Sequence, residues 1–356
     1  MIESRIRHSG DPDVLVVGLG PAGACAAAAA AAAGCRVVAV ERRAEVGEPV
    51  QCAELVSAAL TIEGLPWDSV LSQRTTRMVT VLESRRPEVA EGFPGRMISR
   101  RRFDQALAQR AAARGARCLP GTAVTHVLPD GRVRLSDDRL LHPRALLGAD
   151  GPRSQVGAAI GRSNKELAAA RQVTVPLEEP YEATDIFLRS AYHGGYGWLF
   201  PKGREANLGV GVDYPDRHRL KSLLAGLQSE LVAAGRVRAS APLALTGGLI
   251  PVGGRLPAIG FLAHVPVALA GDAAGLTHPV TGAGIEAAVR SGELAGLALA
   301  RWLGGEASGL DDYEEEISEL YDGAHGRALR HRRETLRSAC AASLWRGWIC
   351  SPEYWQ

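Results

Sequence analysis

Residues 13–41 read DVLVVGLGPAGACAAAAAAAAGCRVVAVE, and this stretch decides the fold. An apolar run from Val14 to Val17 meets a glycine-rich turn. An alanine-rich segment then leads to a second apolar run that ends on Glu41. Strand, glycine turn, helix and strand within about 30 residues are typical of the βαβ unit that binds a dinucleotide. The sequence therefore predicts an α/β, Rossmann-like domain that starts near residue 13.

The glycines of this turn each have a role in such a unit. Gly18 permits the tight turn, Gly20 lets backbone approach a pyrophosphate, and Gly23 lets the helix pack closely on the strand. The helix N-terminus faces the phosphates with unpaired N–H groups and the positive end of its dipole. Glu41 can accept hydrogen bonds from a ribose and would repel a 2′-phosphate, which favours FAD or NAD over NADP. The nucleotide contacts predicted here are Gly18, Gly20, Pro21, Ala22, Gly23, Glu41 and Arg42.

A membrane span or a signal segment is the alternative interpretation of this apolar stretch. It fails because Asp11 and Asp13 precede the stretch, glycines interrupt it, and an acid ends the second strand.

At 356 residues the chain has room for about two domains. Hydrophobic residues make up 46%, charged residues 22%, and the net charge is +2. These values are ordinary for a globular enzyme and give no sign of a nucleic-acid partner.

The cysteines predict neither a metal site nor a disulfide framework. The six are Cys25, Cys35, Cys52, Cys118, Cys340 and Cys350. They form no CxxC pair and no Cys/His spacing typical of zinc. With no export signal recognised, free thiols and a cytoplasmic location are expected.

The order of apolar and polar segments divides the nucleotide-binding part in two. Residues 1–155 and 265–305 are predicted to form this discontinuous domain, with a β-rich substrate or cap domain at 156–264 and a helical C-terminal segment at 306–356. Strands are predicted at 118–119, 124–128, 132–135, 145–147, 171–176, 183–192, 195–201, 207–213, 243–251 and 265–270, and helices at 103–114, 217–234, 284–303 and 311–348.

Further motifs lie outside the opening stretch. They are Asp150-Gly151; Gly271-Asp272-Ala273-Ala274-Gly275 followed by His278-Pro279-Val280-Thr281-Gly282-Ala283-Gly284; Tyr196-Gly197-Trp198-Leu199-Phe200-Pro201 with Gly209-Val210-Gly211 after seven residues; and Pro49-Val50-Gln51-Cys52-Ala53-Glu54. Together with the βαβ unit they resemble FAD-dependent enzymes of the geranylgeranyl reductase family, within the wider aromatic-hydroxylase-like flavoproteins. The YxWxFP…GxG signature is the most specific of them.

The resemblance implies that FAD is the cofactor, held from two directions. Asp272 would bind its ribityl or ribose region, and a helix N-terminus at 282–284 would lie against the flavin, where its dipole favours the reduced, anionic ring. Val124 would offer backbone groups to the adenine. His278 either shapes the flavin pocket or makes a structural hydrogen bond. The FAD contacts that the resemblance implies are Arg100, Val124, Asp150, Asp272, Gly282, Ala283 and Gly284.

Three residues are predicted to carry the chemistry: Cys52, Tyr196 and Trp198. The alternation of Tyr196, Trp198 and Phe200 puts these aromatic rings on one face of a strand. On the pattern alone they are core residues, whereas the resemblance makes them an apolar wall beside flavin and substrate. Cys52 is either a proton donor beside the flavin or a small packing group.

The leading hypothesis is an FAD-dependent oxidoreductase that reduces C=C bonds of a prenyl-like or other apolar substrate by hydride from flavin N5. The alternative is an FAD-dependent monooxygenase that hydroxylates an aromatic or peptide-linked substrate, since the same fold hosts both. A halogenase is less similar, because a WxWxIP pattern is expected there. A non-catalytic FAD-binding protein is the third class.

An electron donor, NAD(P)H or ferredoxin-like, is expected as a partner. The aromatic segment at 345–356 is expected to pack on the fold, and any membrane contact through it to be peripheral.

Overall fold

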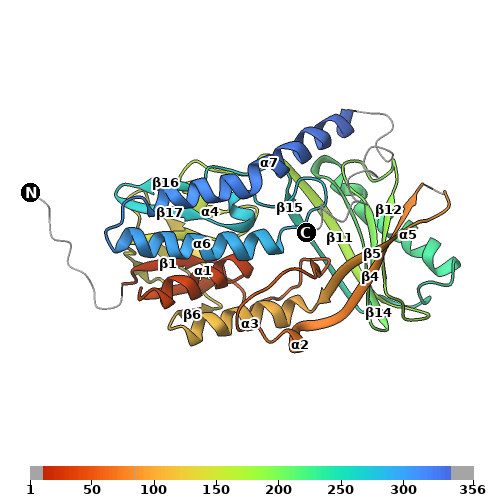
Figure 1. Ribbon diagram of the computed structural model, residues 1–356, viewed down its shortest axis with the longest axis horizontal. Helices are drawn as coiled ribbons and strands as arrows, with labels where there is room; N and C mark the ends of the chain where they lie inside the picture. Colours follow the sequence, from red (N-terminus) through yellow and green to blue (C-terminus); the bar gives the residue numbers. More distant parts are fainter. Residues whose placement is uncertain (1–10, 84, 338–356) are drawn as a thin grey trace, which may run out of the picture.

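The computed structural model describes residues 11–83 and 85–337. Helices α1, α6 and α7 lie together over one part of the molecule, and a large sheet occupies the other end (Figure 1). The strands are β1 (Val14–Val17), β2 (Val37–Glu41), β3 (Leu55–Ser57), β4 (Leu71–Leu82), β5 (Glu88–Ile98), β6 (Arg117–Pro120), β7 (Val124–Val127), β8 (Val133–Leu135), β9 (Leu140–Leu141), β10 (Ala145–Gly148), β11 (Leu167–Pro176), β12 (Ala183–Leu188), β13 (Gly197–Lys202), β14 (Glu205–Asp213), β15 (Ala244–Pro251), β16 (Ile259–Leu262) and β17 (Val265–Leu269). The helices are α1 (Pro21–Ala32), α2 (Trp67–Val70), α3 (Arg100–Ala113), α4 (Gln155–Ala159), η1 (Tyr214–Arg219), α5 (Leu220–Ala233), η2 (Gly271–Ala274), α6 (Ile285–Leu303) and α7 (Gly309–Arg337).

The first sheet is the predicted nucleotide-binding sheet. Its six strands run in the order β16-β17-β10-β1-β2-β6, and all neighbours except β16 and β17 are parallel. Strand β1 lies inside the sheet, with β2 on one side and β10 on the other. Strands from residues 14–41, 117–148 and 259–269 therefore form one sheet, which confirms a discontinuous α/β architecture.

Small residues let two helices approach each other above this sheet. Nine residues of α1 are buried, most of them alanines. A Cβ at Gly292 or Gly296 of α6 would lie 2.2 Å from the Ala22 oxygen or 2.4 Å from the Ala26 oxygen. The alanine-rich stretch is therefore a packing surface against α6, because side chains larger than a methyl group would hold the helices apart.

The second sheet has eight strands in the order β15-β11-β14-β13-β12-β4-β5-β3. Helix α5 packs on it through Leu224, Leu227 and Leu231. The long strands β4 and β5 were not predicted, and with β3 they bring residues 55–98 into this sheet. Their apolar alternation is incomplete: the first half of β4 is mostly polar and partly exposed, and β5 contains two glycines and a proline. The domain boundaries at 155, 265 and 305 stay a prediction.

Helix α7 joins the two sheets. It packs against α6 and β16, and its far end reaches the second sheet, where Arg332 donates to Asp213 of β14 at 2.7 Å (Figure 1). The helix continues without interruption through Gly323 and Gly326. The predicted helix beyond residue 337 and the aromatic segment at 345–356 lie outside the described residues.

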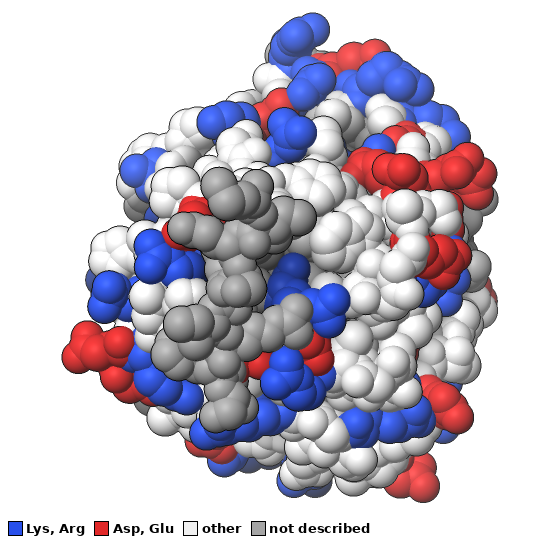
Figure 2. Space-filling view, turned by 90° about the vertical axis from the view of Figure 1, so that its left-hand side faces the viewer, with Lys and Arg blue, Asp and Glu red and all other residues white. Residues whose placement is uncertain are grey.

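No helix among residues 11–83 and 85–337 is long and apolar enough to cross a bilayer. On the face drawn in Figure 2, basic and acidic side chains are interspersed and no area of a single sign dominates. Many arginines have an acidic partner, as in the pairs Arg36–Asp13 and Arg101–Glu45.

Candidate functional site

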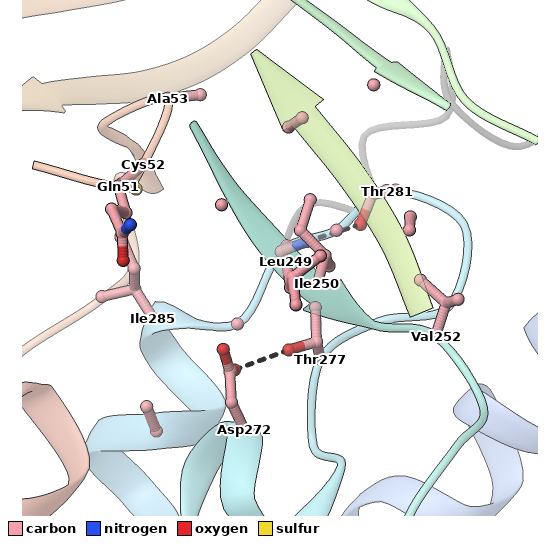
Figure 3. A pocket seen from close by; sticks show the side chains of 18 of the residues that line it. Gln51, Cys52, Ala53, Leu249, Ile250, Val252, Asp272, Thr277, Thr281 and Ile285 are labelled. Carbon is pink, nitrogen blue, oxygen red and sulfur yellow. Dashed lines mark hydrogen bonds between the residues drawn. The ribbon is translucent and has the colours of Figure 1, made fainter. Parts of the chain in front are cut away.

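A cavity of about 310 Å³ lies between the two sheets. It is bounded by the N-terminal ends of α1 and α6, by the loop at 51–54, and by strands β11, β13 and β15. Figure 3 shows Cys52 of the loop, Leu249 and Ile250 of β15, and Asp272 of η2 around it. The predicted site residues that line it are Gly20, Pro21, Ala22, Cys52, Arg100, Tyr196, Trp198, Asp272, Gly282, Ala283 and Gly284.

The turn between β1 and α1 fits a pyrophosphate. Gly18 has φ +99°, and a Cβ there would lie 2.3 Å from the Ala149 oxygen; one at Gly23 would lie 1.9 Å from the Gly18 oxygen. These two glycines are required by the tight turn and close packing. Gly20 instead has open space around its Cβ position and caps α1 without a side-chain hydrogen bond. Unpaired N–H groups of the helix therefore face the cavity, as anion binding requires.

Glu41 ends β2 beside this turn. Its carboxylate accepts from Leu19 N and Arg43 N, each at 3.0 Å. The acid is thus held next to the glycine turn at the end of the second strand, the position from which the adenosine ribose is bound in this fold.

The second helix N-terminus approaches the cavity from the other direction. Gly284 caps α6 without a side-chain hydrogen bond. Asp272 lines the cavity nearby and accepts a hydrogen bond from Thr277 at 2.7 Å (Figure 3). Burial raises the pKa of the Asp272 carboxyl, and the Thr277 bond and the Arg100 charge oppose that rise. A polyol hydroxyl would satisfy such a buried carboxylate.

His278 has a structural role in the turn before α6. Its Nδ1 accepts from the backbone N–H groups of Val280, at 3.3 Å, and Thr281, at 3.1 Å. Burial, and then the neighbouring His325, lowers the pKa of His278 to about 3. Of the two roles considered for His278, the hydrogen bonds that fix the turn are the one observed.

Arg100 is the first residue of α3, which begins three residues earlier than predicted because Ser99 caps it. The guanidinium pairs with Asp104 in two bonds, at 3.0 and 2.9 Å. Burial lowers the pKa of Arg100, but the charge of Asp104 and its hydrogen bonds raise that pKa above its ordinary value. The Arg100 guanidinium therefore interacts with both the Cys52 side chain and the Asp272 carboxylate.

The Cys52 loop is held by side chains of the second sheet. Gln172 of β11 donates to the Cys52 carbonyl at 3.0 Å, and Asn207 of β14 donates to the Ala53 carbonyl at 3.1 Å. The Cys52 Sγ accepts from Glu54 N at 3.1 Å. The thiol is half-buried and lines the cavity, in a loop with several independent restraints.

Glu54 ties this loop to both parts of the molecule. It is buried, accepts from Arg100 N at 2.7 Å and from Asn207 at 2.9 Å, and forms an ion pair with Lys202 of β13. Its φ of +70° is left-handed, a strained conformation for a non-glycine residue. Several bonds to one carboxylate offset the cost of burying it.

The three aromatic side chains lie together on the cavity side of the second sheet. Tyr196 and Trp198 meet edge to face at 5.8 Å, and Trp198 and Phe200 are 6.4 Å apart. The Trp198 indole lies over Gly209, its partner on β14; a Cβ there would be 2.2 Å from the ring. Trp198 Nε1 donates to Gln172 at 2.9 Å. The rings are therefore both core and cavity wall.

Tyr196 is held by its hydroxyl, which donates to the Thr281 carbonyl at 2.5 Å. Burial raises the pKa of Tyr196 above its ordinary value. Its proton is thus committed to a backbone acceptor.

Six predicted contacts lie outside the cavity lining: Gly18, Gly23, Glu41, Arg42, Val124 and Asp150. Asp150 caps α4, accepting from Ser154 at 2.5 Å and from Gln155 N at 2.7 Å, while its neighbours Ala149 and Gly151 line the cavity. Val124 is buried in β7, and Arg42 is exposed. Their predicted roles at the cofactor stay predictions.

Sequence reasoning missed Gln172, Asn207, Lys202 and Arg332. Arg332 is 1% exposed, lines the cavity, and donates to the Gly194 carbonyl at 2.8 Å. It stands in an arginine-rich stretch, so nothing in the pattern separates it from its solvated neighbours. Gln172 carried a usable signal, a single amide inside a predicted strand.

The part of the chain that the structure describes contains no cluster of three or more His, Cys, Asp or Glu side chains placed to hold a metal ion. The residues around the cavity do fit FAD. Two helix N-termini without a side-chain cap, the glycine turn and the buried Asp272 carboxylate all face the same cavity.

Comparison with known proteins gives consistent relatives. A family model described as FAD dependent oxidoreductase matches residues 13–137. A digeranylgeranylglycerophospholipid reductase of Methanocella arvoryzae is 31% identical, covering 86% of this chain and 83% of the relative. Digeranylgeranylglycerophospholipid reductase 1 of Methanopyrus kandleri is 36% identical, covering 80% of this chain and 79% of its own.

Among solved structures, a geranylgeranyl bacteriochlorophyll reductase-like protein from Thermoplasma acidophilum has a TM-score of 0.83 at 25% identity, covering 96% of this chain and 91% of that chain. A probable FAD-dependent monooxygenase from Pseudomonas aeruginosa has a TM-score of 0.69 at 22% identity, covering 94% and 98%. The second likeness shows a common fold and no more.

Proposed function

Because this chain belongs to the family of the digeranylgeranylglycerophospholipid reductases, we propose that it reduces carbon–carbon double bonds in a prenyl-like, apolar substrate. The family resemblance read from the motifs is confirmed, and the chain is an FAD-dependent oxidoreductase. The substrate and the residue roles that follow are proposals.

One observation carries the proposal. The cavity that meets both helix N-termini has a largely apolar wall on its other side, including Trp198, Phe200, Leu249 and Ile250, and Cys52 at its edge. An apolar wall of this kind suits a hydrocarbon chain, since burying such a chain removes apolar surface from water. A polar aromatic substrate would call for more hydrogen-bonding groups than this wall offers.

Reduced FAD, when bound, supplies the hydride for one carbon of the double bond. The protein has to supply the proton for the other carbon and to keep water out. Cys52 is the proposed proton donor, because its thiol faces the cavity and its loop is fixed by Gln172 and Glu54. Tyr196 is the weaker candidate, since its hydroxyl already donates to Thr281. We assign Trp198 and Tyr196 to the wall that orients the chain.

The monooxygenase alternative rests on the common fold, and no contact in the cavity favours it over reduction. The electron donor is proposed only by class, as a nicotinamide nucleotide or a ferredoxin-like protein. A cytoplasmic location stays a prediction from the cysteine pattern.

Anaerobic single turnover tests the proposal. Purified protein with its flavin reduced by dithionite is mixed with geranylgeranyl diphosphate, geranylgeraniol or a set of aromatic compounds, and flavin oxidation is followed by absorbance. The expected result is oxidation by a prenyl compound, whose product gains two hydrogens by mass spectrometry. A product that gains oxygen, formed only in a parallel aerobic run, would replace reduction by oxygenation.

A further inference from the structure

A second cavity lies at the edge of the eight-stranded sheet and is lined by basic side chains. Arg171 comes from β11, Arg217 and His218 from η1, and Lys221 from the first turn of α5. Arg217, His218 and Lys221 are exposed and Arg171 is half-buried. Three permanent cations and a histidine thus converge on one hollow from three elements.

These cations have no acidic partner among the described residues. Within the described part of the chain, no ion pair within 4 Å involves Arg171, Arg217 or Lys221, although many other arginines there have such a pair. Arg217 stacks on the Tyr214 ring at 4.1 Å, which leaves most of its donors available.

The nearby acids are engaged elsewhere. Asp213 accepts from Arg332, and Asp216 faces His193 and Arg219. The positive charge of the cavity is therefore uncompensated by the protein. Burying or crowding such charges is unfavourable unless an anion joins them.

The basic cavity adjoins the FAD and substrate cavity. Ala170, Thr246 and Gly247 line both. Strand β15 is the edge of its sheet, so a long ligand can extend past its free side from one cavity to the other without crossing the sheet. Leu243 and Leu245 at this edge are 58% and 57% exposed, which gives the path an apolar border.

We propose that the cavity formed by Arg171, Arg217 and Lys221 binds the phosphate group of a phosphorylated substrate whose hydrocarbon chain enters the first cavity past β15. Arginine and lysine bind phosphate by charge-assisted hydrogen bonds, and arginine does so in a two-pronged geometry. The choice of substrate phosphate as the ligand rests on the proposed function, whereas the anion site rests on the cations alone.

Isothermal titration calorimetry of the oxidised, FAD-loaded protein tests the anion site and the identity of its ligand separately. The probes are geranylgeranyl diphosphate, geranylgeraniol and inorganic diphosphate, so chain and phosphate are tested together and apart. For the double variant Arg171→Ala/Lys221→Ala we expect affinity for both diphosphates to fall about tenfold or more, while affinity for the alcohol changes less than about twofold. The matched control is Arg134→Ala, which replaces an exposed arginine of β8 and should leave the affinity for all three probes unchanged.

The outcomes are distinct. If inorganic diphosphate binds and depends on Arg171 and Lys221 but neither prenyl probe binds, the anion site stands and the proposed prenyl substrate is wrong. If the diphosphates bind equally well to the double variant, or no diphosphate binds the native protein, the site is wrong. A variant that leaves prenyl diphosphate binding unchanged but raises the KM for NADPH and not for NADH would assign the cations to a nucleotide donor and overturn the proposal.

Discussion

At the scale of single residues, Cys52 is the side chain on which the proposed chemistry depends most. Its sulfur lines the cavity, accepts from Glu54 N and lies beside the Arg100 guanidinium. The other described cysteines are free thiols, and only Cys52 has this position. Position in the fold therefore separates one thiol from chemically identical ones.

Replacing Cys52 with alanine should lower turnover of a prenyl substrate about 100-fold, the lower end of the contribution that a positioned proton donor makes. Flavin content and its absorbance spectrum should stay unchanged, because the FAD-binding residues are untouched. Cys35→Ala, at the far end of α1, is the control and should retain full activity. Equal rates for Cys52→Ala and the native enzyme would leave Cys52 as a packing residue.

Gly209 is the second residue whose size matters, because the Trp198 indole occupies the space where its side chain would be. Gly209→Ala should displace the ring, lower turnover and reduce the free energy of unfolding by about 1–3 kcal/mol in a urea titration. Gly226, in helix α5, has nothing within 4 Å of its Cβ position. Gly226→Ala should therefore leave stability equal or higher by up to about 1 kcal/mol. Equal effects of the two changes would contradict this packing.

At the scale of elements, the loop at 49–54 depends on Glu54, which connects α3 to strands β13 and β14. Glu54→Gln should leave the Lys202 ammonium without its partner and lower the free energy of unfolding by about 3 kcal/mol. The double variant Glu54→Gln/Lys202→Met should recover part of this loss, because no unpaired charge remains. Strictly additive losses in chemical denaturation would show that the pair is uncoupled.

Element prediction from sequence succeeded where side-chain size and backbone freedom leave one solution. The spacing of Gly18, Gly20 and Gly23 correctly predicted β1, α1 and β2. A side chain at Gly18 or Gly23 would collide with backbone atoms, and a side chain at Gly20 would fill the open space next to it. The alternation of Tyr196, Trp198 and Phe200 correctly placed the rings on one face. Strands β4 and β5 were missed because they lack a clear periodic apolar pattern. They pair with each other, and β4 also pairs with the distant strand β12, a contact that local sequence does not reveal.

The candidate site was predictable to the same extent. Residues in short motifs, such as Asp272 and Gly282 to Gly284, do line the cavity. Gln172, Asn207 and Lys202 support the Cys52 loop from strands more than 100 residues away in sequence, so only the sheet order reveals them. Contacts between residues so far apart in the sequence cannot be predicted from local sequence patterns.

At the scale of the whole molecule, helix α7 joins the two sheets, and its buried His325 contacts the turn that starts α6. The ring lies 5.6 Å from His278 and 5.3 Å from Tyr321. Burial lowers the pKa of His325 to about 4, although Asp322 opposes this, and lowers that of His278 to about 3. Both histidines are therefore neutral in the folded protein at pH 7.

Stability should consequently fall in mild acid. Histidine in the unfolded chain titrates near pH 6.5, so below that pH the unfolded state takes up protons that the folded state does not. The free energy of unfolding therefore falls as the pH drops, until the folded pKa values near 4 and 3 are reached. Urea unfolding should show a loss of about 2 kcal/mol for each histidine between pH 7 and pH 5, about 4 kcal/mol in all. His325→Leu should flatten this dependence, while the exposed His126→Gln should leave it unchanged. Parallel curves for all three proteins would contradict the assignment.

The order of strands in the first sheet has a consequence for how the protein folds during synthesis. Strand β1 needs β10 as a neighbour, β10 needs β17, and the second helix N-terminus at the cavity comes only with residue 284. On the ribosome, the glycine turn emerges first but waits through most of translation for its partners. The two helix N-termini at the FAD cavity can therefore come together only after residue 284 has been synthesised.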